Sequence, residues 1–312
     1  MKKHPRRKSI AIPLAVVLVL ISLYAASEIY RTHDFLDYLV DQKGTLVATA
    51  EGRVDDDRRI LQVDMRDSNG LEVTGYLKTP SAGDDPFAVI LALGGIRTGK
   101  EVVNYLDETP GVAIFALDYP YEGKKSSLGA WEFITSVPKI RRALFDTVPA
   151  CMLAVDYLLG REDLDPERII FIGGSVGAMY GPVVGAAEPR LAGVGLLFGA
   201  GDLETVFRVN IHAPAPLPAA GAWIVSLLLS PLEPLKYVGR VSPRPLFMLN
   251  GRGDDRMPIS SSELLHQAAG DPKTIRWIDT GHVHIRSTEF HETIRSEIVD
   301  WLVENGFVEE SF

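Results

Sequence analysis

The chain has 312 residues, 46% of them hydrophobic and 23% charged, a balance typical of a globular protein rather than a disordered one. Residues 1–8 carry five basic side chains and no acidic one, so that removing them from the net charge of −9 leaves −14. Such an acidic body argues against a nucleic-acid-binding surface. The single cysteine, Cys151, excludes an internal disulfide, and its apolar helical surroundings indicate a buried small hydrophobe rather than a nucleophile.

The N-terminal segment predicts a membrane anchor. Residues 10–26 form a run of 17 residues without a charge, directly after the basic flank. That length is about the minimum for a membrane-spanning helix, and the basic flank is expected to stay in the cytoplasm. We therefore predict a cytoplasmic flank at 1–8, a transmembrane signal anchor at 9–27, and a body on the outer side of the cell membrane. A signal peptide cleaved near Ala25-Ala26-Ser27, which would release a secreted protein, is the alternative.

The rest of the chain predicts one α/β domain. After a connector at 28–50, residues 58–80 alternate apolar and polar side chains on both sides of Ser68-Asn69-Gly70, which predicts an antiparallel hairpin. Six apolar runs follow, with helical patterns between them, and this order is typical of a mostly parallel, doubly wound sheet. The expected strands are 87–95, 112–120, 169–174, 193–201, 245–254 and 274–282, and the expected helices are 100–107, 137–160, 177–187, 259–269 and 287–304.

One turn in this domain predicts a nucleophile. Gly173-Gly174-Ser175-Val176-Gly177 follows an apolar strand and precedes a helical segment, and it matches the G-x-S-x-G motif. In that motif the chain turns sharply and lifts the serine hydroxyl clear of the backbone, and small neighbours are needed because side chains would collide with the strand and the helix. The alternative is a Gly-Ser turn that merely opens a helix.

A serine nucleophile needs a base, and the base needs an acid to orient it. Asp254 follows the next-to-last expected strand and His282 follows the last one, in the chain order Ser, Asp, His that this arrangement requires. The neighbouring Asp255 and His284 are alternatives for the acid and the base. We predict no metal site, since no acidic or cysteine ligand set accompanies these histidines.

The remaining part of such a site is a pair of amide donors for the oxyanion. We assign one to Val176, directly after the serine, and the other to Gly95 in the loop after the strand at 87–95. Glycines at 94 and 95 would let the backbone approach a substrate closely. Packing of a glycine turn is the alternative explanation.

From about residue 55 to 305, the chain resembles the α/β-hydrolase superfamily. "EDLDPERIIFIGGSVGA" and "SPRPLFMLNGRGDDRMP" resemble segments of its dienelactone hydrolase, acetyl xylan esterase and prolyl oligopeptidase-like branches. "ALDYPYEGKKS" resembles the turn after the fourth strand, in which Asp118 is structural. The chain departs from the family pattern at Leu93, where a histidine is frequent, and at Ala178, where a second glycine is frequent.

The resemblance implies hydrolysis of an ester through an acyl-enzyme, without a cofactor, with a small-molecule ester as the substrate. Peptide or amide cleavage, as in the prolyl oligopeptidase-like branch, is one alternative, and a non-catalytic binding protein of the same fold is another. The oligomeric state is not predicted.

A Pro-rich, apolar stretch at about 202–243 predicts a small helical cap inserted into the domain at 51–312. Within it Trp223, Ile224, Leu227 and Leu228 recur at helical spacing. We interpret Trp223 and Leu227 as candidates for the wall of an apolar acyl pocket. A helix packed into the core, or a face that touches the membrane, is the alternative.

Overall fold

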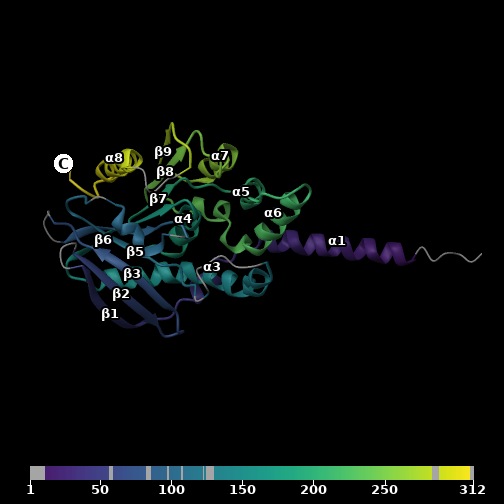
Figure 1. The fold of residues 1–312 in the computed structure, drawn as a ribbon, viewed down its shortest axis with the longest axis horizontal. Helices are drawn as coiled ribbons and strands as arrows, with labels where there is room; N and C mark the ends of the chain where they lie inside the picture. The colour runs from purple at the N-terminus through teal and green to yellow at the C-terminus, as the bar shows by residue number, and fades with distance from the viewer. Residues whose placement is uncertain are drawn as a thin grey trace, which may run out of the picture.

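The computed structural model describes residues 11–55, 59–81, 86–96, 98–106, 108–121, 123, 130–282 and 288–309. The described strands form one sheet in the order β1-β2-β3-β5-β4-β6-β7-β8-β9 (Figure 1). They are β1 (Leu46–Asp55), β2 (Ile60–Asp67), β3 (Glu72–Lys78), β4 (Phe87–Leu93), β5 (Val112–Leu117), β6 (Leu164–Gly174), β7 (Gly193–Leu197), β8 (Leu246–Gly251) and β9 (Lys273–Ile278).

The described α-helices are α1 (Ala11–Thr32), α2 (Leu36–Asp41), α3 (Ala130–Leu159), α4 (Val176–Ala187), α5 (Leu203–Asn210), α6 (Leu217–Leu228), α7 (Ile259–Ala268) and α8 (Thr288–Glu304). The 3₁₀ helices are η1 (Gly99–Asn104), η2 (Ser230–Leu232), η3 (Pro234–Lys236) and η4 (Val238–Arg240). The expected alternation of strand and helix is therefore confirmed.

The N-terminal part of the sheet is antiparallel. β2 and β3 form the expected hairpin, and its turn is held by Asp67, whose Oδ1 accepts hydrogen bonds from the amides of Asn69 and Leu71. Gly70 adopts a φ of +85°, which is accessible to glycine without strain. β1 pairs with β2 and begins at Leu46, inside the segment expected to be a connector. As an edge strand it leaves much of its side-chain surface exposed, so no strong apolar alternation marks it in the sequence.

From β5 to β9 the strands are parallel, and both faces of this part are covered. Alternate residues of β4 contribute to two cores: Val89, Leu91 and Leu93 to the one that includes α3 and α4, and Ala88, Ile90 and Ala92 to the one that includes η1 and α8. The first core contains Cys151. Burial raises the pKa of its thiol to about 12, so the side chain behaves as a small hydrophobe, as expected.

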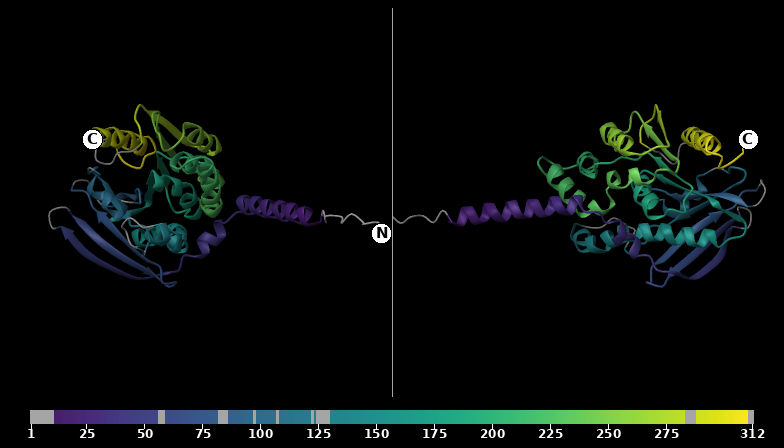
Figure 2. Two further views of the ribbon diagram at one scale, coloured as in Figure 1. Left: turned by 45° about the vertical axis from the view of Figure 1, so that its right-hand side comes forward. Right: turned by 180° about the vertical axis from the view of Figure 1, so that it is seen from behind.

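The N-terminal helix α1 projects from the body, and α6 lies beside its root (Figure 2). From Val16 to Leu23 the side chains of its outer part are apolar except for Ser22, and the apolar ones are more or less half exposed. In the part of the chain that the structure describes, no helix combines the length and the apolar character needed to cross a membrane.

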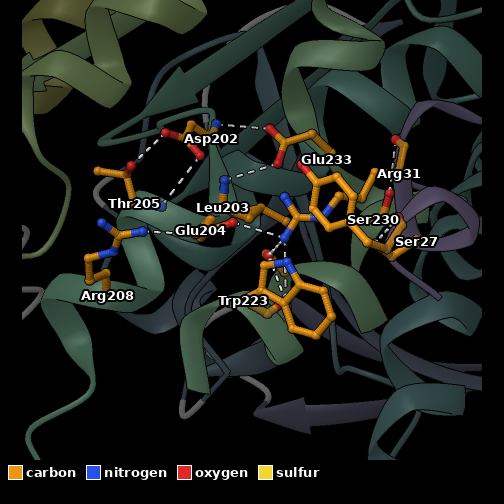
Figure 3. A network of polar contacts seen from close by, with 12 residues as sticks. Ser27, Arg31, Asp202, Leu203, Glu204, Thr205, Arg208, Trp223, Ser230 and Glu233 are labelled. Carbon is orange, nitrogen blue, oxygen red and sulfur yellow. Dashed lines mark hydrogen bonds and ion pairs between the residues drawn. The ribbon is translucent and has the colours of Figure 1, made fainter. Parts of the chain in front are cut away.

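The segment expected as a helical cap contains α5, α6 and the three short 3₁₀ helices η2 to η4. Asp202 caps the N-terminus of α5, and its side chain accepts hydrogen bonds from the amide and the hydroxyl of Thr205. The half-buried carboxylate of Glu233 accepts hydrogen bonds from the backbone amides of Asp202 and Leu203, both at 2.9 Å, and so joins the start of α5 to η3 (Figure 3).

A buried histidine predicts a specific loss of stability in acid. His266 on α7 is buried, with its Nε2 2.9 Å from Asn250 Oδ1. Burial, assisted by the nearby Lys273 ammonium, lowers its pKa to about 4. The imidazole of His266 therefore binds a proton more readily in the unfolded chain than in the folded one. The stability that the neutral imidazole contributes to the fold is present above pH 6.5 and is lost as the pH falls toward 4. We expect a loss of about 2–3 kcal/mol in the free energy of unfolding between pH 7.5 and 4.5.

Urea unfolding of the wild type and of His266→Gln at these two pH values measures this effect. The glutamine keeps a donor for Asn250 but does not titrate, so the variant is expected to lose less stability than the wild type by that amount. Equal losses in both proteins would show that His266 does not titrate in this way.

Candidate active site

Ser175 lies at the sharp turn between β6 and α4. Its backbone has φ 55° and ψ −112°, a positive φ that a residue other than glycine rarely adopts. The amide of Ser175 donates to the carbonyl of Leu197 on the neighbouring strand, at 2.8 Å. A Cβ on Gly177 would overlap the Leu93 carbonyl, and one on Gly173 would overlap the Gly177 backbone. Gly173 and Gly177 are therefore required by packing at the turn.

The structure brings the three predicted catalytic side chains together from three strand ends. Ser175 Oγ lies 2.8 Å from Nε2 of His282, and Nδ1 of that histidine lies 2.8 Å from Oδ2 of Asp254. With Nδ1–H donating to the carboxylate, Nε2 is left as the acceptor for the serine hydroxyl. His282 is only 6% exposed, and its ring packs edge-on against Phe198. The orientation of the imidazole is thus fixed from two sides.

Asp254 is held as a carboxylate. Burial alone would raise its pKa, but the hydrogen bond with His282 and the amides of Met257 and Arg256 outweigh burial and lower the pKa below its ordinary value. Its side chain is 1% exposed, whereas the neighbouring Asp255 is exposed. Of the two aspartates, Asp254 is the one that contacts the histidine. The alternative base, His284, lies outside the described residues.

The two residues predicted to donate amides to the oxyanion, Gly95 and Val176, also lie at the cavity beside Ser175. Gly95 follows β4, Val176 is the first residue of α4, and both line the same cavity as Ser175. The first amides of a helix have no acceptor within the helix, so the Val176 amide is available to a ligand. The Gly94–Gly95 backbone is fixed from behind, because the Tyr119 hydroxyl donates to the Gly94 carbonyl at 2.6 Å and the amide of Thr98 donates to the Gly95 carbonyl at 2.9 Å.

Asp118 supports the same loop from the end of β5. Its carboxylate accepts hydrogen bonds from the backbone amide and the ammonium group of Lys100, at the start of η1. Gly99 has a φ of +48°, and a Cβ there would overlap the Asp118 carboxylate. Asp118 thus lies in a supporting position, and its described contacts are with this loop rather than with Ser175, His282 or Asp254.

A cavity of about 570 Å³ opens at Ser175 and His282. Its walls are mostly apolar and come from the sheet face that carries Ile90, Ile114 and Ile172, from η1, and from α8. This size is within the range of small-molecule sites. The contributions of η1 and α8 were not anticipated from the sequence. Four apolar residues of α8 line the cavity, at a spacing that could have indicated this face: Ile294, Ile298, Val299 and Leu302.

The interpretation of Trp223 and Leu227 as pocket walls is corrected by this geometry. Neither residue is among the described residues that line the cavity, which lies on the face of the sheet covered by η1 and α8. α6 instead buries Ala222 and Ser226, and Trp223 remains 37% exposed. Figure 3 shows Arg31 of α1 bridging this region: its guanidinium donates to Glu204 and Ser226 at 2.9 Å and lies 5.8 Å from the centre of the Trp223 ring. The helical spacing on α6 therefore marks a face beside α1 rather than a pocket.

Within the described residues, no group of three or more His, Cys, Asp or Glu side chains is placed to hold a metal ion.

Comparison with known proteins identifies the fold. No family model matches the chain. An uncharacterized Escherichia coli K12 protein, YfhR, is 24% identical over 257 residues, which is 77% of this chain and 80% of that protein. The Salmonella typhi protein of the same name is 28% identical over 215 residues, 67% of this chain and 68% of that protein.

Among solved structures, an acetyl xylan esterase from Paenibacillus sp. R4 aligns with a TM-score of 0.64 and 19% identity, over 85% of this chain and 91% of that one. Acetyl xylan esterase 1 from Thermoanaerobacterium aligns with a TM-score of 0.61 and 13% identity, over 87% and 92%. An esterase from Pyrococcus furiosus aligns with a TM-score of 0.56 and 16% identity, over 84% of this chain and 97% of that one. The chain has the α/β-hydrolase fold, in agreement with the resemblance seen in its sequence.

Proposed function

We propose that the protein is a serine hydrolase that cleaves carboxylic esters. The observation that carries this proposal is the continuous hydrogen-bonded relay from Ser175 through His282 to Asp254, at the mouth of an apolar cavity. Several solved structures of similar fold are those of esterases, which supports ester bonds as the target.

The chemistry follows from the geometry. Ser175 Oγ attacks the ester carbonyl carbon while His282 Nε2 accepts the hydroxyl proton, and Asp254 stabilises the imidazolium that forms. The amides of Gly95 and Val176 stabilise the oxyanion of the tetrahedral intermediate. His282 then gives the proton to the leaving alcohol, and the acyl group remains on Ser175. A water molecule, deprotonated by the same histidine, hydrolyses this acyl-enzyme and restores the serine.

Amide cleavage is the second candidate function, because the same relay serves both bonds. A panel that pairs each ester with the amide of the same acyl group decides between them. We expect kcat/KM to be higher for the ester in every pair. A consistent preference for aminoacyl amides would reverse the assignment.

We propose that the cavity beside α8 receives the apolar acyl chain of the substrate. Burial of each methylene contributes about 0.8 kcal/mol, so kcat/KM should rise by up to about fourfold per added carbon from acetyl toward hexanoyl esters. Ile298 of α8 lines the cavity and is half-buried. Ile298→Trp is therefore expected to abolish the rise while acetyl ester turnover continues, in a series of para-nitrophenyl esters.

Ile224→Trp provides the matched control, because Ile224 is exposed on α6 and does not line the cavity. This variant is expected to keep the chain-length profile of the wild type. If Ile224→Trp changed the profile and Ile298→Trp did not, the acyl chain would lie under the cap helix and not beside α8.

We also propose that α1 attaches the enzyme to the cell membrane, with the hydrolase body on the extracytoplasmic side. The basic flank at 1–8 and the exposed apolar side chains from Val16 to Leu23 support this. Arg31 and its partners would hold the root of this helix against the body. After carbonate washing, the protein is expected to stay in the membrane fraction, with its body accessible to external protease.

Leu18→Asp combined with Leu20→Asp should shift the protein toward the soluble fraction, since both side chains are exposed on the projecting helix. A soluble mature chain beginning at Glu28 in the wild type would instead support secretion after cleavage.

A further inference from the structure

The described residues that line the cavity include basic side chains but no carboxylate. Among the described residues that line it, those with ionisable side chains are Tyr105, Arg256, His282, His291 and Arg295, and none of the lining residues is an aspartate or a glutamate. The whole chain, by contrast, contains 41 acidic and 32 basic residues. An acidic protein thus presents a locally cationic rim to its own active site, which favours anions there.

Two of these side chains come from one face of α8. His291 and Arg295 are four residues apart, so they lie on neighbouring turns of the helix and both reach the cavity. Nε2 of His291 is buried and has no hydrogen-bond partner among the described residues. An unpaired buried polar atom is unfavourable, and a ligand that hydrogen-bonds to it would remove that penalty. The chain therefore places a buried imidazole nitrogen and a cation on the same face of α8, at the cavity.

Arg295 lies within α8, and one nitrogen of its guanidinium group forms a hydrogen bond with the protein. Nη2 donates to the carbonyl of Glu108 at 3.0 Å, and no carboxylate of the described residues forms an ion pair with it. A guanidinium carries five N–H donors, so several remain for a ligand. Arg295 is exposed, which places its charge at the rim rather than deep in the cavity.

Arg256 adds a second cation from the loop that carries Asp254. Its amide donates to Asp254 Oδ1 at 2.8 Å, and its carbonyl accepts from Asn210 Nδ2 at 2.8 Å, so its backbone is fixed. Within the described residues its guanidinium has no acidic partner. The two arginines thus leave their positive charge available to whatever enters the cavity.

We propose that the physiological substrate is an ester that also carries a carboxylate, and that His291 and Arg295 bind this carboxylate while Arg256 adds attraction at the rim. This inference rests on the proposed esterase function and specifies its substrate class. Guanidinium and imidazole donors suit a carboxylate, and hydrogen bonds to charged groups are the stronger ones. The carboxylate can belong to the acyl part or to the alcohol part of the ester.

Two matched pairs of probes test the proposal. For the acyl part, the para-nitrophenyl monoester of glutaric acid is compared with para-nitrophenyl pentanoate. For the alcohol part, para-carboxyphenyl pentanoate is compared with para-carbamoylphenyl pentanoate. We expect one anionic probe to exceed its neutral partner in kcat/KM by about ten- to hundredfold, chiefly through a lower KM, and this ratio to fall with added salt. The pair that shows the preference tells which part carries the carboxylate.

Substitutions connect the preference to the proposed residues. Arg295→Gln is expected to lower the ratio of anionic to neutral kcat/KM about tenfold, Arg295→Glu to invert it, and His291→Leu to lower it in the same direction. Arg252→Gln is the control, because Arg252 is exposed on the same loop as Arg256, pairs with Asp279 and does not line the cavity. It is expected to keep the wild-type ratio.

Equal kcat/KM within both pairs, or a preference that survives Arg295→Glu and His291→Leu, would overturn the proposal. Continued turnover of the neutral probes would then show that the esterase function stands and only the substrate class is wrong. Absence of turnover with every probe, together with no acylation of Ser175, would overturn both.

Discussion

Ser175→Ala is expected to lower kcat/KM for a short-chain para-nitrophenyl ester by about 10⁴-fold or more. The hydroxyl is placed to act as the nucleophile, since it lies 2.8 Å from the histidine nitrogen that would accept its proton. Loss of Oγ leaves the cavity and the amide donors in place, so residual activity should be close to that provided by binding and oxyanion stabilisation alone. Steady-state hydrolysis of the purified protein measures the effect.

Ser260→Ala is the control for this substitution, because Ser260 is exposed at the start of α7 and does not line the cavity. It should have wild-type activity, and both variants should unfold at the wild-type temperature. Turnover by Ser175→Ala within tenfold of the wild type would contradict the nucleophile assignment.

Asp254→Asn is expected to lower kcat by about 10³- to 10⁴-fold. The amide keeps the size of the side chain, but it cannot stabilise the imidazolium, and it favours the histidine tautomer with the proton on Nε2. That tautomer cannot accept the proton of Ser175. The substitution therefore removes the base without emptying the site, and the loss should be in kcat more than in KM.

The adjacent aspartate offers a matched control. Asp255 is exposed and forms no contact with His282, so Asp255→Asn should leave kcat within about twofold of the wild type. A large loss in Asp255→Asn with little loss in Asp254→Asn would reverse the choice of acid.

The fold and the placement of the three candidate catalytic side chains could be derived from the sequence because both depend on local rules. Buried parallel strands read as continuous apolar runs, and their carboxyl ends meet at one edge of the sheet. Ser175, Asp254 and His282 each follow such a strand, and the structure places them in contact. The glycines at 173 and 177 were expected for steric reasons. The structure shows which atoms a side chain there would meet: the Gly177 backbone at position 173 and the Leu93 carbonyl at position 177.

The position of the pocket could not be derived in this way. It depends on which face of the sheet leaves space, and that is decided by how η1 and α8 pack rather than by any local pattern. The apolar spacing of Trp223 and Leu227 indicated a helix face, but periodicity does not tell whether that face meets a substrate, another helix or solvent. Edge strand β1 was missed for a related reason, since exposed strands carry little apolar alternation.

The most direct test of the central claim is the site of covalent modification by a fluorophosphonate, determined by intact-protein and peptide mass spectrometry. We expect a single adduct on the peptide that contains Ser175, formed at least 100-fold more slowly in Asp254→Asn and absent from Ser175→Ala. An adduct of equal extent on Ser175→Ala, or modification at a different serine in the wild type, would contradict it.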